Sequence, residues 1–340
     1  MTTRSQSAPR GRPTLETVAA LAGVSRATVS RVVNGHARVR PEHRAAVRAA
    51  IAATGFVPNR AARSLVTRRH ESVALLLREP AEFGVADPYL SGIVIGVSQA
   101  LIGSGLQLVM LMAAADEDHR RTADYLRGHV DGVVLVSVHD DDPLPAELVR
   151  QGVPAVAGGR PGAGLAGVSV VDVDNRGGGR LAAGHLLAAG RRRPATIAGP
   201  PDMSAADDRL AGFCEALEAA GRPAPPVARG DFTAASGESA MAGLLARDPE
   251  LDAVFAANDL MAVGALAALR AAGRSVPGDV AVVGFDDVPP AGHAHPPLTT
   301  VRQPVADQAR LLVRLLTERL AGAAPAEVVL PTTLVVRASA

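Results

Sequence analysis

The chain has 340 residues, 48% of them hydrophobic, and a formal net charge of +1 at pH 7. This length is sufficient for two or three folding units with cores of their own. A single cysteine, Cys214, excludes a disulfide framework and favours a reducing compartment. The arginine-rich N-terminus predicts no secretory signal and no apolar stretch predicts a membrane span, so we expect a cytoplasmic protein without membrane partners.

The charge is distributed unevenly along the chain. Residues 1–70 contain 13 arginines against two glutamates, a net charge of +11, whereas the remainder carries a net charge of −10. A basic N-terminal module on an acidic body is typical of a nucleic-acid-binding head joined to a second domain.

Two short helices are predicted near the N-terminus. Segment 14–22, TLETVAALA, has an apolar face and an N-cap at Thr14. Segment 23–35, GVSRATVSRVVNG, predicts a second helix that Ser25 caps and Asn34–Gly35 ends, because both residues of that pair tolerate the left-handed conformation. A glycine-containing turn between two such helices predicts a helix-turn-helix.

The second helix carries a polar face opposite its valines. Arginine and hydroxyl side chains on that face suit contacts with DNA phosphates and base edges. The alternative is a solvated amphipathic hairpin inside another helical domain, which the basic charge of this region does not favour. The polar face consists of Arg26, Ala27, Ser30, Arg31 and Asn34.

Residues 40–56 predict a third helix, which starts near Pro41 and ends at Gly55. After Pro58 a further short helix is predicted. Its Leu65 either packs against its own neighbours or inserts as an apolar wedge into the DNA minor groove. The polar side chains of this segment that can reach phosphates are Asn59, Arg60 and Arg63.

From residue 72 onward, apolar runs alternate with helical patterns such as 88–103. This alternation predicts open parallel sheets covered by helices, in two lobes, with a ligand between them at the carboxyl ends of the strands. The predicted strands are 72–77, 106–111, 131–137, 153–159, 168–174, 194–199, 251–259 and 279–287. Polar residues at those ends are Asp87, Ser137, Arg160, Arg209, Asn258 and Asp286.

Residues 14–66, TLETVAALAGVSRATVSRVVNG followed by GFVPNRAARSL, resemble the LacI/GalR family of bacterial transcription repressors. The resemblance implies that residues 58–66 form a hinge helix with Leu65 wedged at the central step of a palindromic operator. It implies base contacts from Arg26, Ala27 and Arg31. The complete set of DNA-binding residues that we predict is Thr14, Ser25, Arg26, Ala27, Thr28, Ser30, Arg31, Asn34, Asn59, Arg60, Arg63 and Leu65.

The resemblance extends to segments 198–213, 256–266 and 284–304. Carried over by position, it implies that Arg209, Asn258 and Asp286 contact the ligand and that Phe232 lies against a sugar face. An arginine, an amide and a carboxylate suit vicinal sugar hydroxyls, which both donate and accept hydrogen bonds. Short matches, among them YLSGIVIGV, GGRP and DNRGGGR, most resemble cellobiose-responsive repressors, which implies a β-linked gluco-oligosaccharide.

One departure from the family pattern concerns the strand that ends near residues 158–160. Relatives often carry aspartate or asparagine there, whereas this chain has Gly158–Gly159–Arg160. This departure leaves room for a second sugar ring.

We therefore predict a small all-α helix-turn-helix head (1–57), a hinge helix and linker (58–71), and an α/β sensor and dimerisation domain (72–340) with two lobes, as in periplasmic binding proteins. A homodimer would hold two heads on a palindromic operator. The C-terminal sequence lacks a leucine heptad, which favours a dimer over a tetramer. Sugar would close the cleft and release the hinges. We predict no enzyme activity, cofactor or metal site.

Two alternatives stay open at this stage. The ligand could act as a corepressor, such as a purine or a phosphosugar bound by Arg160 and Arg209, or the chain could be a transport-type sugar-binding protein. The missing signal sequence and the basic head oppose the transport role. We expect DNRGGGR (174–180) to be a strand-to-helix turn, and the acidic HDDD loop (139–142) and the histidines of the loop 293–295 to face solvent.

Overall fold

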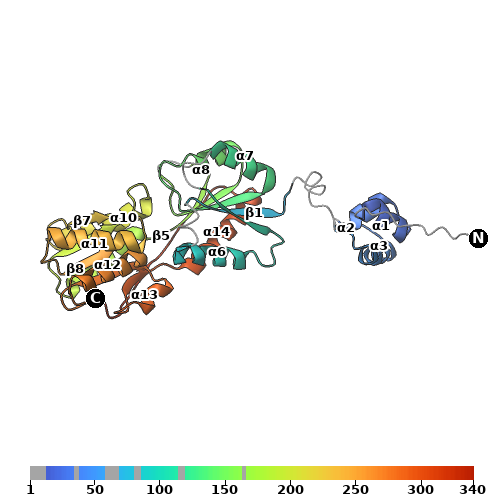
Figure 1. Ribbon diagram of the computed structural model, residues 1–340. Coiled ribbons are helices and arrows are strands. Elements are labelled where there is room, and N and C mark those ends of the chain that lie inside the picture. Colours follow the sequence, from blue (N-terminus) through green and yellow to red (C-terminus); the bar gives the residue numbers. More distant parts are fainter. Residues whose placement is uncertain (1–12, 34–37, 58–68, 80–85, 114–118, 163–165) are drawn as a thin grey trace, which may run out of the picture. The chain divides into compact units, whose positions relative to one another are not determined.

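The computed structural model describes residues 13–33, 38–57, 69–79, 86–113, 119–162 and 166–340. The chain divides into two compact units, Met1–His70 and Glu71–Ala340, each of which is considered separately below (Figure 1).

The first unit is a small helical head of α1 (Leu15–Ala22), α2 (Arg26–Val33) and α3 (Pro41–Thr54). The predicted caps are confirmed: Thr14 accepts the N–H of the first turn of α1, and the Ser25 hydroxyl accepts the Thr28 N–H at 3.1 Å. Left-handed glycines end α1 and α3, as predicted for the latter at Gly55. A core of Val18, Ala19, Val29, Val47, Ala50 and Phe56 joins the three helices.

The first lobe of the second unit contains a six-stranded sheet in the order β11-β5-β4-β3-β1-β2, and its described pairings are all parallel. Both faces of β1 and β3 are buried, as their unbroken apolar runs require. The strands are β1 (Ser72–Leu77), β2 (Gln107–Met112), β3 (Gly132–Val136), β4 (Ala155–Gly158), β5 (Ser169–Val173) and β11 (Glu327–Leu330).

Helices cover both faces of this sheet. α6 (Pro88–Ala100) and α14 (Val305–Leu320) pack on one face, and α7 (His119–His129) and α8 (Leu144–Arg150) on the other. The resulting layers are those expected of a parallel sheet, whose crossover connections run over its faces.

The second lobe repeats this arrangement in the order β12-β10-β9-β8-β6-β7. The pair β10–β12 is antiparallel and the other described pairs are parallel. The strands are β6 (Pro194–Ala198), β7 (Val227–Arg229), β8 (Ala253–Ala256), β9 (Ala281–Asp286), β10 (Thr299–Arg302) and β12 (Thr333–Val335).

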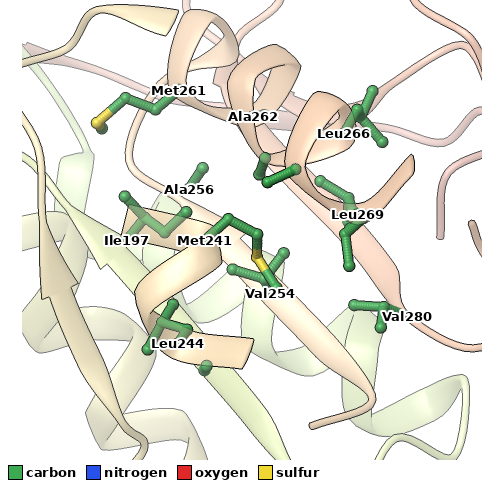
Figure 2. Packing of buried hydrophobic residues seen from close by; sticks show 14 of the residues in the cluster. Ile197, Met241, Leu244, Val254, Ala256, Met261, Ala262, Leu266, Leu269 and Val280 are labelled. Carbon is green, nitrogen blue, oxygen red and sulfur yellow. The ribbon is translucent and has the colours of Figure 1, made fainter. Parts of the chain in front are cut away.

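Four helices enclose the second sheet, and a short fifth, α13 (Pro289–His293), follows β9. α9 (Asn175–Ala188) and α10 (Ser204–Ala219) cover one face. α11 (Ala234–Arg247) and α12 (Asp259–Ala271) cover the other, where Met241 and Leu244 meet Ile197, Val254 and the α12 side chains (Figure 2). This apolar layer holds in place the strand ends beside which polar residues such as Asn258 and Asp286 lie.

The chain passes between the lobes at three places: between β5 and α9, between β10 and α14, and between β11 and β12. The predicted two-lobed α/β architecture is therefore confirmed. Residues 174–180 begin α9, with Asp174 as its N-cap accepting the Gly177 N–H at 2.7 Å, so the expected strand-to-helix turn is in fact mostly the first turns of the helix.

Candidate functional site

In the head, α2 presents a polar face away from the core residue Val29. Of the residues predicted to contact DNA, Thr14, Ser25, Arg26, Ala27 and Arg31 are exposed, and Thr28 and Ser30 are half-buried. Arg26 pairs with Glu16 at 2.9 Å, but both side chains are exposed, so solvent screens this ion pair. Asn34, Asn59, Arg60, Arg63 and Leu65 lie outside the described residues.

In the sensor unit, Arg209 of α10 is the central cation of the cleft. It is buried, and its guanidinium lies over the Phe285 ring, 3.8 Å from the ring centroid. Its Nε donates to Asn175 at 2.8 Å, and its Nη1 donates to the Ala257 carbonyl at 2.6 Å and lies 3.5 Å from Asp286. The guanidinium is therefore fixed in orientation before any ligand arrives.

Asp286, at the end of β9, is a buried carboxyl beside this cation. Burial raises its pKa to about 7, and the neighbouring Arg209 opposes that rise. Gln303 donates to it at 2.5 Å. Burial and the charge of Asp286 also raise the pKa of Asp259 well above its ordinary value. A carboxyl that titrates near neutrality can both donate to and accept from a hydroxyl group.

Asn258 and Phe232 lie together beside β8. The Asn258 side chain accepts the Met261 N–H at 2.9 Å, which caps α12, and donates to the Phe232 carbonyl at 2.8 Å. Phe232 is half-buried against the apolar layer of Figure 2. The asparagine thus holds the backbone of the aromatic residue predicted to meet a sugar face.

The first lobe contributes polar groups from the start of α6. Asp87 caps α6 by accepting the Tyr89 N–H at 2.7 Å, and burial raises the pKa of Asp87. Burial likewise raises the pKa of Tyr89, whose hydroxyl donates to Gln308 at 3.1 Å. Asp87 lies close enough to Arg209 and Asp286 to influence, or be influenced by, their charges. These groups face the cation across the two lobes.

Ser137 and Arg160 lie at the ends of neighbouring strands, β3 and β4. Ser137 donates to Glu79 at 2.7 Å. Arg160 pairs with Asp208 and lies 3.4 Å from Asp172, a carboxyl whose pKa burial raises. Both arginines predicted to contact ligand therefore already have carboxylate partners.

A cavity of about 560 Å³ adjoins Arg160. Its size is in the range of pockets that hold small organic ligands. Its described polar lining consists of Asp140, Arg160, Ser204 and Glu327.

The expectation that the loop 139–142 faces solvent is wrong for two of its members. Asp142 forms a bidentate pair with Arg78 at 2.5 and 3.0 Å, and both side chains are fully buried. His139 lies between Glu79 and Asp202. The loop folds inward because it meets the exit of β1 and the second lobe. His293 and His295 are exposed, as expected.

Several residues of the cleft escaped the sequence analysis. Asn175 lies in DNRGGGR (174–180) and Gln303 in segment 284–304, so both belong to stretches that resemble the family, but neither was predicted to contact the ligand. Phe285 is apolar and precedes Asp286, so nothing but the fold distinguishes it from a core residue. Among the described residues, no group of three or more histidine, cysteine, aspartate or glutamate side chains could hold a metal ion.

A helical head of this kind and a two-lobed sensor with a polar cleft define a DNA-binding regulator controlled by a small molecule. Residues 14–59 match the model of bacterial regulatory proteins of the lacI family, and residues 183–340 match that of periplasmic binding protein-like domains. The chain is 54% identical over 336 residues to the HTH-type transcriptional regulator CelR of Thermobifida fusca, which covers 97% of this chain and 99% of the relative. It is 35% identical over 313 residues to the ribose operon repressor of Escherichia coli K12, covering 90% and 93%.

Two solved structures extend these similarities to the fold. A transcriptional regulator CelR–cellobiose complex is 51% identical, with a TM-score of 0.77 and coverage of 97% of this chain and 100% of the other. A lac repressor dimer bound to operator and the anti-inducer ONPF is 29% identical, with a TM-score of 0.85 and coverage of 97% and 99%. The chain belongs to the lacI family of bacterial regulatory proteins. No helix in the described part of the chain is long and apolar enough to cross a membrane.

Proposed function

We propose that this protein is a cytoplasmic transcriptional repressor whose operator affinity is lowered by a cellobiose-like, β-linked gluco-oligosaccharide. The observation that carries the proposal is the pairing of both cleft arginines with carboxylates: Arg209 with Asp286, and Arg160 with Asp172 and Asp208. A neutral polyhydroxyl ligand fits between such groups, because its hydroxyls can serve donors and acceptors alike.

The same pairing argues against a phosphorylated ligand. A phosphate favours cations whose charge is not already balanced, whereas the charge of Arg209 already acts on three carboxyls, Asp87, Asp172 and Asp286, of which Asp286 lies 3.5 Å from its Nη1. Burying an anion among them would be opposed by like charge. A corepressor such as a phosphosugar is therefore the less favoured ligand class.

Of the residues proposed to bind ligand, Arg160 alone lines the cavity of about 560 Å³, so this cavity supports space for a second ring on the side of Arg160. We assign the first ring to Arg209, Asn258, Asp286 and Phe232, and the second to the side of Arg160. The CelR–cellobiose complex, at 51% identity, supports a glucose disaccharide in particular. The proposed ligand-binding set remains Asp87, Ser137, Arg160, Arg209, Phe232, Asn258 and Asp286.

In the head, the proposed DNA-contacting residues of α2 are Arg26, Ala27 and Arg31, which are all exposed. The domain boundaries proposed from the sequence, 57/58 and 71/72, place the head in the first compact unit. The proposal assigns no catalytic step and no cofactor to any residue.

We also propose that the protein acts as a homodimer. α6 exposes Ile95, the turn that follows it exposes Ile102, and the edge strand β2 exposes Met110; these side chains are 57%, 81% and 48% exposed. Exposed apolar groups gathered at a sheet edge mark an interaction surface. The lac repressor dimer on operator supports pairing of two copies.

The experiment that tests the effector is fluorescence anisotropy on an inverted repeat from the upstream region of the gene, with cellobiose, glucose and glucose 6-phosphate titrated in turn. We expect cellobiose alone to release the DNA. Tighter binding with any of the three would make the ligand a corepressor and overturn the proposal.

A matched pair of variants locates the effect. Asp286→Asn removes a carboxylate acceptor from the cleft and should raise the cellobiose concentration needed for release. Asp279→Asn replaces an exposed carboxylate outside the cleft and should leave that concentration unchanged. Equal responses from the two variants would contradict the assigned site.

A further inference from the structure

Contacts between the lobes, apart from the three chain crossings, converge on residues 202–209 of the second lobe. The Asp140 N–H donates to the Asp202 carbonyl at 2.7 Å, and His139 Nδ1 lies 2.6 Å from the Asp202 carboxylate. Two residues further along, Ser204 donates to the Arg160 carbonyl at 2.6 Å. This short segment therefore contacts the first lobe at two neighbouring points, Asp202 and Ser204.

His139 is held between two carboxylates, one from each lobe. Its Nε2 lies 3.6 Å from Glu79 of the first lobe, and its Nδ1 contacts Asp202 of the second. The imidazole is 18% exposed. The nearby carboxylates of Glu79 and Asp202 raise the pKa of His139 to about 9, although burial opposes the rise. Asp140, the next residue, is a further carboxyl facing Asp202 and His139.

The first-lobe side of this contact rests on a rigid support. Arg78 and Asp142 form the buried bidentate pair described above, and Arg78 also donates to the Ala113 carbonyl at 2.8 Å. Asp142 in turn accepts the Leu144 N–H at 2.9 Å at the start of α8. Removing either partner would leave a buried charge without its counter-ion, which is strongly destabilising, so the loop that carries His139 is firmly anchored.

The second-lobe side leads directly to the cation of the cleft. Asp202 precedes α10, Asp208 lies in its second turn, and Arg209 is the next residue. Because α10 is one continuous helix, a displacement at residues 202–208 also displaces the guanidinium that lies over Phe285.

We propose that His139 is a positioning residue that fastens the two lobes together over the bound effector by pairing, in its charged form, with Asp202. This His139–Asp202 clasp rests on the sugar site proposed above. It links effector binding to the binding of a proton by His139. Opening of the lobes separates His139 from Asp202 and leaves it closer to an ordinary histidine.

The sign of the pH effect follows from the pKa difference between the two forms. The closed form binds the proton more tightly, because only there does the Asp202 carboxylate join Glu79 in raising the pKa of His139, which reaches about 9. The clasp therefore contributes fully below the pKa of the open form, in which Glu79 alone raises the pKa of His139, and is lost as pH rises through about 9. Between those limits effector affinity should fall by up to about tenfold per pH unit.

The test measures cellobiose affinity of the intact protein without DNA, by calorimetry from pH 6 to pH 9. His139→Asn retains a neutral donor near the position of Nδ1, so we expect its affinity to decline less steeply with pH than that of the wild type. His139→Ala should show the same shallower decline and bind about tenfold more weakly at pH 7. The matched control, His293→Asn, replaces an exposed histidine whose ring lies 2.8 Å from the Pro289 carbonyl within α13. It should keep the wild-type profile.

Asp286 also titrates in this range, but it is present in all four proteins, so the difference between their profiles isolates His139. A His139→Asn profile that declines as steeply as wild type overturns the clasp.

A second measurement separates failure of the clasp from failure of the proposed effector. NMR titration of the histidine rings should give His139 a higher pKa in the wild type than in Asp202→Asn, in which only Glu79 remains beside the imidazole, and this difference should grow when cellobiose is bound. If cellobiose does not bind at any pH, the effector proposal fails while this titration still decides the clasp. An ordinary pKa in the wild type, or no change in Asp202→Asn, would overturn it.

Discussion

Ser137, Phe232 and Asp286 adopt positive φ angles of 60°, 68° and 111°, a conformation that residues with side chains rarely enter. Such a conformation costs about 1–3 kcal/mol and persists only where neighbouring contacts impose it. Here a hydrogen bond restrains each residue: Ser137 to Glu79, Phe232 to Asn258, and Asp286 to Gln303. All three belong to the predicted ligand set, so backbone strain is concentrated where the sequence placed the site.

Replacing Arg209 with lysine tests the preorganised cation. The planar guanidinium of Arg209 donates to Asn175 and to the Ala257 carbonyl while its flat face covers the Phe285 ring. The compact ammonium group of lysine has no such face and cannot make all three contacts. We expect Arg209→Lys to weaken cellobiose binding by about 30-fold, or about 2 kcal/mol, as measured by calorimetry. Arg310→Lys, an exposed exchange on α14, should not change it. Unchanged affinity in Arg209→Lys would show that the guanidinium geometry is not used.

The raised pKa of Asp286 predicts a pH-dependent stability. Because the folded protein binds this proton more tightly than the unfolded chain, the contribution is fully present below pH 3.8 and is lost as pH rises through about 7. Asp286→Asn should therefore reduce the fall in unfolding free energy between pH 4 and pH 7 by on the order of 2 kcal/mol in urea titrations.

Asp279→Asn should change the pH dependence of the unfolding free energy in the opposite direction from Asp286→Asn. Hydrogen bonds from Ser275 lower the pKa of Asp279, so its contribution is present above pH 3.8 and is lost as pH falls. Replacing Asp279 with asparagine should therefore make the unfolding free energy fall more steeply between pH 4 and pH 7. Identical profiles for the two variants would contradict the assignment.

At the scale of single residues, the sequence predicted Arg209, Asn258 and Asp286 through family resemblance. It did not reveal Glu79, His139 or Asp202, which belong to the contact between the lobes. His139 lies 63 residues from Asp202 in the chain, and Ser137 lies 58 residues from Glu79. Only the folded chain brings such residues together, and no local pattern records the pairing.

At the scale of elements, glycines allow helices α9 and α10 to pack with their backbones in contact. A Cβ on Gly179 would overlap the carbonyl oxygen of Arg209, and one on Gly212 would overlap that of Arg176. The motif DNRGGGR therefore serves helix packing behind the cleft. Which of its glycines face α10 depends on how the two helices pack, and no local pattern in the sequence records that.

Two alanine substitutions in α9 should have opposite effects. Gly179→Ala forces α10 and its Arg209 outward and should lower the unfolding free energy by about 2 kcal/mol and weaken cellobiose binding. Gly184→Ala meets nothing within 4 Å and should raise the unfolding free energy by about 1 kcal/mol, because alanine is the better helix former. Urea denaturation measures both. A neutral Gly179→Ala would show that the helices separate without cost.

Strands were predicted where their composition was apolar and missed where it was not. β1, β3 and β6 are buried apolar runs and stood out in the sequence. β7, β11 and β12 are short and partly exposed. β10 begins with two buried threonines, so it did not read as an apolar run. Edge position and short length remove the apolar signal on which the prediction depended.

At the scale of the whole molecule, a repressor of this class couples two binding sites through one equilibrium. If cellobiose weakens operator binding by a given factor, operator must weaken cellobiose binding by the same factor. We expect the two factors, measured by anisotropy and by calorimetry with saturating operator, to agree within error at each pH. A persistent inequality would mean that the active form contains more than these components, such as a different oligomer in each assay.

The crossings between lobes also bear on the order in which the protein is made. The first lobe is completed by α14 and β11, and α14 places Leu312 and Leu316 in its core. A ribosome therefore releases the basic head more than 200 residues before the chain contains everything that this lobe needs. Until synthesis is almost finished, the nascent chain has a DNA-reading segment without a finished sensor, and interrupted synthesis would leave a head that no sugar controls.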